Sequence, residues 1–352
     1  MQDVAIVSFV QSDCVRYAGA QNEVELIMPV VQAALKEAGL SSVQDVDFTC
    51  SGSCDYQQGA AFAFVAGVDA LGAVPPIKES HVEMDAAWAL YESWLKIQMG
   101  QAESALIYGF GKSSPGELSN VLSLQLDPYY LAPLGVDTIS LAAMQARSLL
   151  ESGEVNEVDL AEVVVNSRAN AKNNPHAQLS GDFTVDQLLA EPETVSPLRK
   201  HDCCPISDGA AAMVICTVEK AKAMGKPYAV IKGIDHRIET HHVTLRDLRR
   251  SPSVEIAAEK AGVHDAPVDV AEIYAPFSHQ EIIVKRALGL DDSVAINPSG
   301  GVLAGHLFMA SGLSRVGEVA KRIIAGEYKR GVAHATSGPC LQQNMILVLE
   351  GM

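Results

Sequence analysis

The sequence predicts a layered α/β protein made of two repeated halves. Residues 34–40 (ALKEAGL) resemble residues 257–263 (AAEKAGV), and the glycines of the two segments lie 223 residues apart. Residues 95–109 and 321–335 form a second matching pair, whose glycines lie 226 residues apart. In all four segments a helical pattern ends at glycine and leads into an apolar run, which is typical of a helix followed by a strand. Two pairs at nearly the same offset indicate that one half was duplicated.

Apolar, β-branched runs predict strands that helices cover on both faces. The first strand is expected directly after Asp3, where the run VAIVSFV begins without a basic leader or cleavage site before it. Residues 161–165 (AEVVV) and 211–216 (AAMVIC) are predicted as further strands. Near-continuous apolar strands are typical of sheets buried between layers of helices.

The repeat divides the chain into predicted halves of residues 1–225 and 226–352. A segment of about residues 110–199 has no counterpart in the second half and is predicted as an inserted lobe of helices and loops. It contains the polar run 166–175 (NSRANAKNNP) and two adjacent tyrosines. Lobes of this kind commonly carry substrate specificity.

Charge and composition argue against several functions. The chain has 352 residues, of which 48% are hydrophobic, and a formal net charge of −17 that would repel a nucleic-acid backbone. Its most apolar stretch, residues 60–76, contains Asp69 and several glycines and falls short of the about 20 residues that span a bilayer. Seven cysteines without a disulfide-framework spacing fit a reducing compartment. We therefore expect a cytoplasmic protein that neither binds nucleic acid nor spans a membrane.

Two segments resemble the most characteristic motifs of thiolases. They are residues 201–214 (HDCCPISDGAAAMV) and 297–312 (NPSGGVLAGHLFMASG), and the sterol-carrier or lipid-transfer type of thiolase homologue, similar to steroid side-chain CoA aldolases, is the closest in pattern. The duplication and the inserted lobe match the layout of this superfamily. The resemblance implies a five-layered αβαβα fold, an acyl-CoA substrate, a dimer, and no cofactor besides the CoA that the substrate carries.

The nucleophile of thiolases is a cysteine at the N-terminus of a buried helix, and the resemblance places it at Glu83, with Asp85 two residues further on. Neither residue has a thiol. A helix N-terminus can hold a carboxylate, but a carboxylate is a poor substitute for an acyl-accepting thiolate. Two interpretations stay open for these acids, a catalytic role in proton transfer and simple helix capping.

The second half supplies the other candidate residues. Tyr274 stands where thiolases have Asn or His, and aldolases of the lipid-transfer type also carry Tyr there. It is either a proton-transfer group or a core tyrosine. His306 keeps the histidine of the Gly-His-Pro motif, although Leu307 replaces the proline; in the family this histidine donates a hydrogen bond to the thioester oxygen. The flanking glycines, Gly301 and Gly305, are expected to contact substrate.

Several cysteines and histidines remain to be assigned. Cys340 lies close to the position of the second catalytic cysteine of thiolases, but Ser337 is the alternative occupant and a predicted substrate contact. The adjacent pair Cys203 and Cys204 is predicted to be packing residues. His279 is expected on a helix surface. No metal site is predicted, because no cysteine pair has a matching set of ligands.

Three functions follow from these residues. The leading hypothesis is a retro-aldol lyase that cleaves a β-hydroxyacyl-CoA, with a sterol side chain as one candidate acyl group. The second is a 3-ketoacyl-CoA thiolase or acetyl-CoA acetyltransferase that uses Cys340 or another cysteine. The third is a non-catalytic subunit or lipid-transfer protein. The resemblance also implies partners: a second copy of the chain, another thiolase-like chain, and a small protein with an OB-fold and zinc ribbon.

Overall fold

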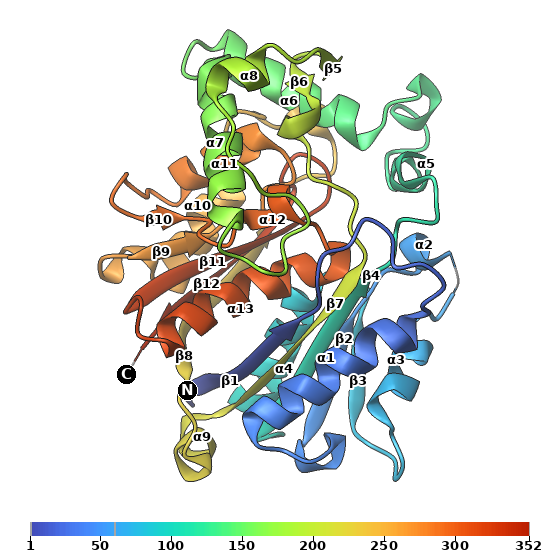
Figure 1. Ribbon diagram of the computed structural model, residues 1–352, viewed down its shortest axis with the longest axis vertical. Coiled ribbons are helices and arrows are strands. Elements are labelled where there is room, and N and C mark those ends of the chain that lie inside the picture. The colour runs from blue at the N-terminus through green and yellow to red at the C-terminus, as the bar shows by residue number, and fades with distance from the viewer. Residues whose placement is uncertain (1, 60, 352) are drawn as a thin grey trace.

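The computed structural model describes residues 2–59 and 61–351 and contains a sheet of ten strands (Figure 1). The strand order is β10–β9–β11–β12–β8–β1–β7–β4–β2–β3. The strands are β1 Val4–Gln11, β2 Phe48–Gly52, β3 Glu79–Val82, β4 Ser104–Gly111, β7 Gly209–Thr217, β8 Ala229–Ile238, β9 Val270–Glu272, β10 Ala295–Ile296, β11 Arg330–Ser337 and β12 Gln343–Glu350. A short antiparallel pairing of β1 with β8 joins two five-stranded halves.

The two halves of the sheet repeat one arrangement. In the N-terminal half β2 pairs in parallel with β3 and β4, and β7 runs antiparallel between β4 and β1. In the C-terminal half β9 pairs in parallel with β10 and β11, and β12 runs antiparallel between β11 and β8. This is the arrangement that a duplicated chain would give, while the domain limit at residues 225 and 226 stays a prediction.

All four predicted helix ends are confirmed. The helices end at glycines with positive φ, a conformation that side chains with a Cβ rarely adopt. In each case a strand follows along the chain. The helix, its glycine and the next strand are α1 Glu23–Ala38, Gly39 and β2; α4 Ala86–Gln98, Gly100 and β4; α10 Pro252–Ala261, Gly262 and β9; and α13 Ser311–Ile324, Gly326 and β11.

The predicted five-layered αβαβα fold is confirmed by the position of three hydrophobic clusters. The central cluster contains α4 and α13, which lie between the two halves of the sheet (Figure 1). A second cluster packs α1 and α3 (Phe64–Leu71) on the outer face of the N-terminal half. The third packs α10 and α11 (Ser278–Ala287) on the outer face of the C-terminal half. The active-site candidates of both halves therefore meet at the central layer.

Helix α13 is buried along most of its length, and its small residues make this possible. A Cβ atom at Gly317 would lie 2.1 Å from the ring of Phe9, so only glycine lets β1 approach the helix this closely.

Within the described residues, no helix has both the length and the apolar character needed to cross a membrane. The remaining helices of the two halves are short: α2 Asp55–Gln58, α9 Val218–Met224 and α12 Gly301–Ala304.

The inserted lobe consists mainly of helices, as the sequence predicted. It contains α5 Leu118–Ser123, α6 Thr138–Glu151, α7 Glu157–Ala171, α8 Val185–Leu189 and the two-stranded sheet of β5 Glu193–Val195 and β6 Leu198–Arg199. The strand predicted at residues 161–165 is wrong, because these residues lie within α7. Asn156 caps this helix through a capping box with Asp159, and its buried residues recur at helical spacing. A short apolar run cannot by itself distinguish a strand from a buried helix face.

Candidate active site

A cavity of about 610 Å³ lies where the two halves and the lobe meet. Its wall includes Asp85 at the N-terminus of α4, Phe308 and Met309 just before α13, and residues of α5 and α6. Six of the eight residues proposed from the sequence line it: Glu83, Asp85, Tyr274, His306, Ser337 and Cys340. Gly301 and Gly305 do not line it. Gly305 is instead packed against Cys14, whose Sγ would lie 2.7 Å from an added Cβ.

Tyr274 and His306 are in direct contact in this cavity. The phenolic oxygen of Tyr274 lies 2.7 Å from Nε2 of His306, and the backbone N–H of His306 donates to Oγ of Ser207 at 2.9 Å. Burial, with the nearby charge of Arg315, lowers the pKa of His306 to about 3. Burial, with the charge of Asp85, raises the pKa of Tyr274 well above its usual value. Both groups are therefore neutral at pH 7, which suits a pair that passes a proton.

Cys204 is the third member of this group, and it was missed in the sequence. Its Sγ lies 3.5 Å from Nδ1 of His306, so both ring nitrogens of the histidine have partners. Burial raises the pKa of the Cys204 thiol to about 12, which keeps it protonated. The prediction of a purely packing cysteine rested on its neighbour Cys203, and no spacing rule could have placed it beside a residue 102 positions away.

Asp85 occupies the N-termini of two helices at once. One carboxylate oxygen accepts the backbone N–H groups of Ala87 at 2.8 Å and Leu313 at 3.2 Å, and the other accepts that of Gly312 at 2.8 Å. It therefore caps α4 as well as α13, where the two halves of the chain meet. Burial raises the pKa of Asp85 to about 7, although the three N–H donors and Arg315 favour its charged form.

The predicted helix N-terminus at Glu83 is wrong by two residues, because α4 begins after Asp85. The Glu83 side chain is about half exposed, and its Oε1 accepts the backbone N–H of Asp55 at 2.5 Å while Oε2 lies 3.3 Å from Nε2 of His81. Glu83 thus stands at the edge of the cavity. Asp85 holds the position at which a helix N-terminus would activate a nucleophile.

Cys340 lines the cavity but does not contact the histidine. Its thiol donates to the carbonyl oxygen of Leu141 at 3.5 Å, and burial raises its pKa to about 11. Cys340 and Leu341 both have positive φ, +54° and +59°, in the turn between β11 and β12. Non-glycine residues seldom adopt this conformation, because it strains the backbone. Ser337, the last residue of β11, lines the same part of the wall.

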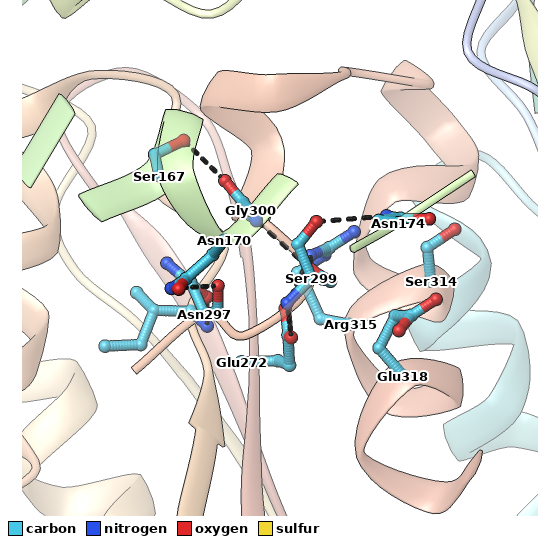
Figure 2. A network of polar contacts seen from close by, with 12 residues as sticks. Ser167, Asn170, Asn174, Glu272, Asn297, Ser299, Gly300, Ser314, Arg315 and Glu318 are labelled. Carbon is cyan, nitrogen blue, oxygen red and sulfur yellow. Dashed lines mark hydrogen bonds and ion pairs between the residues drawn. The ribbon is translucent and has the colours of Figure 1, made fainter. Parts of the chain in front are cut away.

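A buried polar network fixes the loop that carries Tyr274 (Figure 2). The carboxylate of Glu272, at the end of β9, accepts a hydrogen bond from Nη1 of Arg315 at 2.5 Å. It also accepts two hydrogen bonds from Ser299, one from the backbone N–H at 2.9 Å and one from Oγ at 2.7 Å. Asn297 accepts the backbone N–H of Ile273 at 2.6 Å, one residue before Tyr274. The hydrogen bonds from Ser299 reinforce the buried ion pair and hold Glu272 and Arg315 in one geometry. The network therefore ties the Tyr274 loop to α13 and to the segment that leads to His306.

Polar residues of α7 and the turn after it form hydrogen bonds with the segment that leads to His306. Figure 2 shows side chains of α7 and the turn after it facing the backbone of residues 297–300. Their donors bind carbonyl oxygens there and at residue 303: Ser167 to Gly300, Asn170 to Asn297, Asn174 to Ser299, and Arg168 to Leu303. The polar run in the lobe thus holds the loop that precedes His306, while residues of α5 and α6 line the cavity.

Comparison with known proteins agrees with this fold. Residues 234–349 match the family model described as "Thiolase, C-terminal domain". The chain is 28% identical to an acetyl-CoA acetyltransferase of Methanocaldococcus jannaschii, over 91% of this chain and 89% of that protein. It is 26% identical to sterol carrier protein 2 of Gallus gallus, over 78% of this chain and 57% of that protein. The solved structure titled "Ltp2-ChsH2(DUF35) aldolase" superposes with a TM-score of 0.80 at 19% identity, covering 99% of this chain and 98% of that chain.

The fold and the cavity are those of a thiolase-like acyl-CoA enzyme. Residues 234–349 match the thiolase C-terminal domain, and the chain as a whole is similar to members of the thiolase superfamily, with relatives among the thiolases and sterol carrier proteins. Members of this superfamily include both acyltransferases and carbon–carbon lyases, as the names of these relatives and neighbours indicate.

Proposed function

We propose that the protein is a retro-aldol lyase that cleaves a β-hydroxyacyl-CoA to a carbonyl compound and a shorter acyl-CoA. The observation that carries this proposal is the 2.7 Å contact between Tyr274 and His306 in a cavity where Asp85, instead of a thiol, occupies the helix N-terminus. Retro-aldol cleavage needs a proton-transfer group and stabilisation of an enolate, but no covalent intermediate.

The reaction can be written through these two side chains. The β-hydroxyl gives its proton to the oxygen of Tyr274 while Tyr274 passes its own proton to Nε2 of His306. The electrons of the O–H bond form the new carbonyl, the bond between the α- and β-carbons breaks, and its electron pair becomes the thioester enolate. The imidazolium of His306 stabilises this charge, and it readily returns its proton through Tyr274 to the α-carbon because burial disfavours the charged ring.

The residues in the wall of the cavity favour a substrate whose acyl group has a bulky apolar part. A sterol side chain is one example of such a group. Apolar residues from the lobe and from the loop after Tyr274 contribute to it, among them Leu118, Leu122, Ile139 and Phe277. Apolar lining with a few polar groups at one end is typical of sites that take a hydrophobic substrate and hold its reacting atoms.

Product analysis tests the proposal directly. The purified protein, with any co-purifying partners, is incubated with a panel of β-hydroxyacyl-CoA thioesters that includes one with a sterol group, and the products are identified by mass spectrometry. We expect a ketone or aldehyde together with acetyl- or propionyl-CoA. If every substrate binds but stays intact, the lyase is excluded and a non-catalytic subunit or lipid-transfer role becomes the better explanation.

Cys204 supports a second candidate function, acyl transfer by a thiolase mechanism. A thiol 3.5 Å from an imidazole can become a nucleophile if the histidine accepts its proton. The two functions need opposite tautomers of His306, because the lyase uses Nε2 as the acceptor and the thiolase uses Nδ1. The pKa of about 12 that burial gives the Cys204 thiol favours the lyase.

Replacement of Cys204 by alanine separates the two functions. We expect Cys204→Ala to keep the β-hydroxyacyl-CoA cleavage rate within about threefold of wild type, because the thiol takes no part in the proposed proton transfer. Cys340→Ala serves as a matched control in the same cavity, with the same small effect. If the protein instead cleaves a β-ketoacyl-CoA with free CoA as co-substrate, and Cys204→Ala lowers that rate by about 10³-fold or more, the proposal passes to the thiolase mechanism.

A further inference from the structure

Phe308 contacts both members of the Tyr274–His306 pair. Its ring centroid lies 4.6 Å from that of His306, and the two ring planes are tilted by 43°. Its carbonyl oxygen lies 3.5 Å from the phenolic oxygen of Tyr274, which has a closer partner in Nε2 of His306. A centroid separation of 4.6 Å is typical of aromatic rings in contact. One side of the imidazole is therefore covered by an apolar ring.

Phe308 has a backbone conformation that disfavours a phenylalanine. Its φ is +48°, a value that residues with a Cβ atom seldom adopt. It begins the 3₁₀ turn Phe308–Ala310, which leads directly into α13. Strained residues of this kind persist only where the surrounding structure holds them in place, and glycine would fit the same φ with less strain. The retained ring therefore indicates a role that glycine cannot perform.

The end of β4 holds this turn in place. A Cβ atom at Gly111, the last residue of the strand, would overlap the carbonyl oxygen of Leu307 and lie 3.0 Å from Cβ of Phe308. Gly111 does not line the cavity, whereas Phe308 and His306 do. The strand thus packs on the side of the turn away from the cavity and leaves the Phe308 ring no room to withdraw. With this ring against it, His306 is only 6% exposed although it lines the cavity.

Four ionisable side chains act on this pair. Tyr274 and Cys204 are the partners of the two ring nitrogens of His306, and burial raises the pKa of both, so neither changes charge between pH 5.5 and 8.5. Arg315, on α13, stays positive over this range and disfavours a protonated imidazole. Asp85 has a pKa of about 7, and its charge acts on Tyr274. Because Asp85 changes charge in the same range, a test has to observe His306 itself.

We propose that Phe308 is a positioning residue for His306, whose ring shields the imidazole from water in the cavity and holds it toward Tyr274. The inference deepens the proposed function and rests on it only for its kinetic consequence. A histidine that water reaches approaches its ordinary pKa of 6.5 and is protonated below that value. A protonated imidazole has no nitrogen free to accept the proton of Tyr274. Without the Phe308 ring, the acceptor would therefore be lost at mildly acidic pH.

Phe308→Gly tests this inference, because glycine removes the ring and fits a φ of +48°. The ring ¹³Cε1–¹Hε1 signals of the histidines are followed by NMR from pH 5.5 to 8.5, and the signal of His306 is assigned by its absence in His306→Gln. We expect the His306 signal of the wild type to stay fixed over this range, because burial and Arg315 lower the pKa of His306 to about 3. In Phe308→Gly we expect this signal to titrate with a midpoint between about 5.5 and 6.5.

Two further substitutions serve as controls. Phe308→Leu keeps an apolar side chain beside the imidazole and should leave the His306 signal fixed. Phe183→Ala removes a ring whose centroid lies 5.2 Å from that of His201, outside the cavity, and should also leave the His306 signal fixed. The inference is overturned if His306 stays fixed in folded Phe308→Gly. It is equally overturned if His306 of the wild type already titrates near pH 6.5, a result that needs no variant.

Cleavage kinetics separates this inference from the proposed function. The ratio of kcat of Phe308→Gly to kcat of the wild type is expected to fall about two- to tenfold between pH 8 and pH 5.5, and the ratio cancels the titration that Asp85 contributes to both proteins. If the wild type cleaves no β-hydroxyacyl-CoA, the proposed function fails, while the NMR titration still decides the role of Phe308. Cleavage by the wild type with a ratio that does not vary with pH contradicts the inference alone.

Discussion

Tyr274→Phe is expected to lower kcat for β-hydroxyacyl-CoA cleavage by about 10²- to 10⁴-fold and to leave KM nearly unchanged. The substitution removes only the hydroxyl that lies 2.7 Å from Nε2 of His306, so the shape of the cavity is kept while the proton path is broken. His306→Ala is expected to lower kcat by a similar factor, because the proton leaving Tyr274 then has no acceptor.

The double variant makes this prediction sharper. If the two side chains act as one unit, combining Tyr274→Phe with His306→Ala should cost little more than either change alone. Tyr228→Phe is the matched control, since Tyr228 is buried in the outer core of the N-terminal half and away from the cavity. Steady-state kinetics measures kcat and KM of each variant, and thermal denaturation shows that each variant is folded. Full activity in both single variants would exclude the proposed mechanism.

Local patterns predicted much of the fold. The helix-glycine-strand segments were predicted correctly because helices commonly end at a glycine in the left-handed conformation, as at Gly39 and Gly262, and such a glycine can be recognised in the sequence. The strand predicted at residues 161–165 failed because three valines fit either a strand or one face of a helix. The capping box that begins at Asn156, five residues before this segment, was the signal that could have corrected the prediction.

The candidate site was only partly predictable. The resemblance to thiolases selected Tyr274 and His306, and the structure brings these two into contact. Cys204 could not be selected, since its contact with His306 spans 102 positions and is supplied only by folding. The placement of His279 on a helix surface is wrong for the same reason, because α6 buries it beside Gln145. The two-residue error between Glu83 and Asp85 has a similar cause, because the true cap is defined by hydrogen bonds from α13 as well as from α4.

Asp85 joins these two central helices, and this explains why an acid stands at the N-terminus of α4, two residues after the nucleophile position that the sequence predicted at Glu83. Its carboxylate satisfies N–H groups of both helix N-termini in a fully buried position. Gly312 is part of the arrangement, since a Cβ there would lie 2.5 Å from Oδ1 of Asp85. The carboxyl group that caps both helices at the junction of the two halves also lies close enough to Tyr274 for its negative charge to raise the pKa of Tyr274. Structure and proposed chemistry are thus coupled through one residue.

Asp85→Ala is expected to destabilise the protein by about 3 kcal/mol or more, because three backbone N–H groups lose their acceptor at a position that is only 2% exposed. Asp85→Asn should cost less, since its amide oxygen can still accept from Ala87 and Leu313, although its NH₂ group faces the N–H of Gly312. Urea denaturation of the three proteins at pH 7 measures these differences. Equal midpoints for wild type and Asp85→Ala would contradict the capping role.

The pH dependence of stability provides an independent measurement of the same group. Burial raises the folded-state pKa of Asp85 to about 7 from an ordinary value of 3.8. Between these values the folded protein binds a proton that the unfolded chain does not, so this contribution to stability is complete below pH 3.8 and is lost as the pH rises through 7. The slope is at most about 1.4 kcal/mol per pH unit. Asp85→Asn cannot take up this proton, so the difference in stability between wild type and Asp85→Asn should shift in favour of wild type as the pH falls from 8 to 5. A difference that does not vary with pH would show that Asp85 stays ionised in the fold, with the two helix N-termini outweighing the cost of burial.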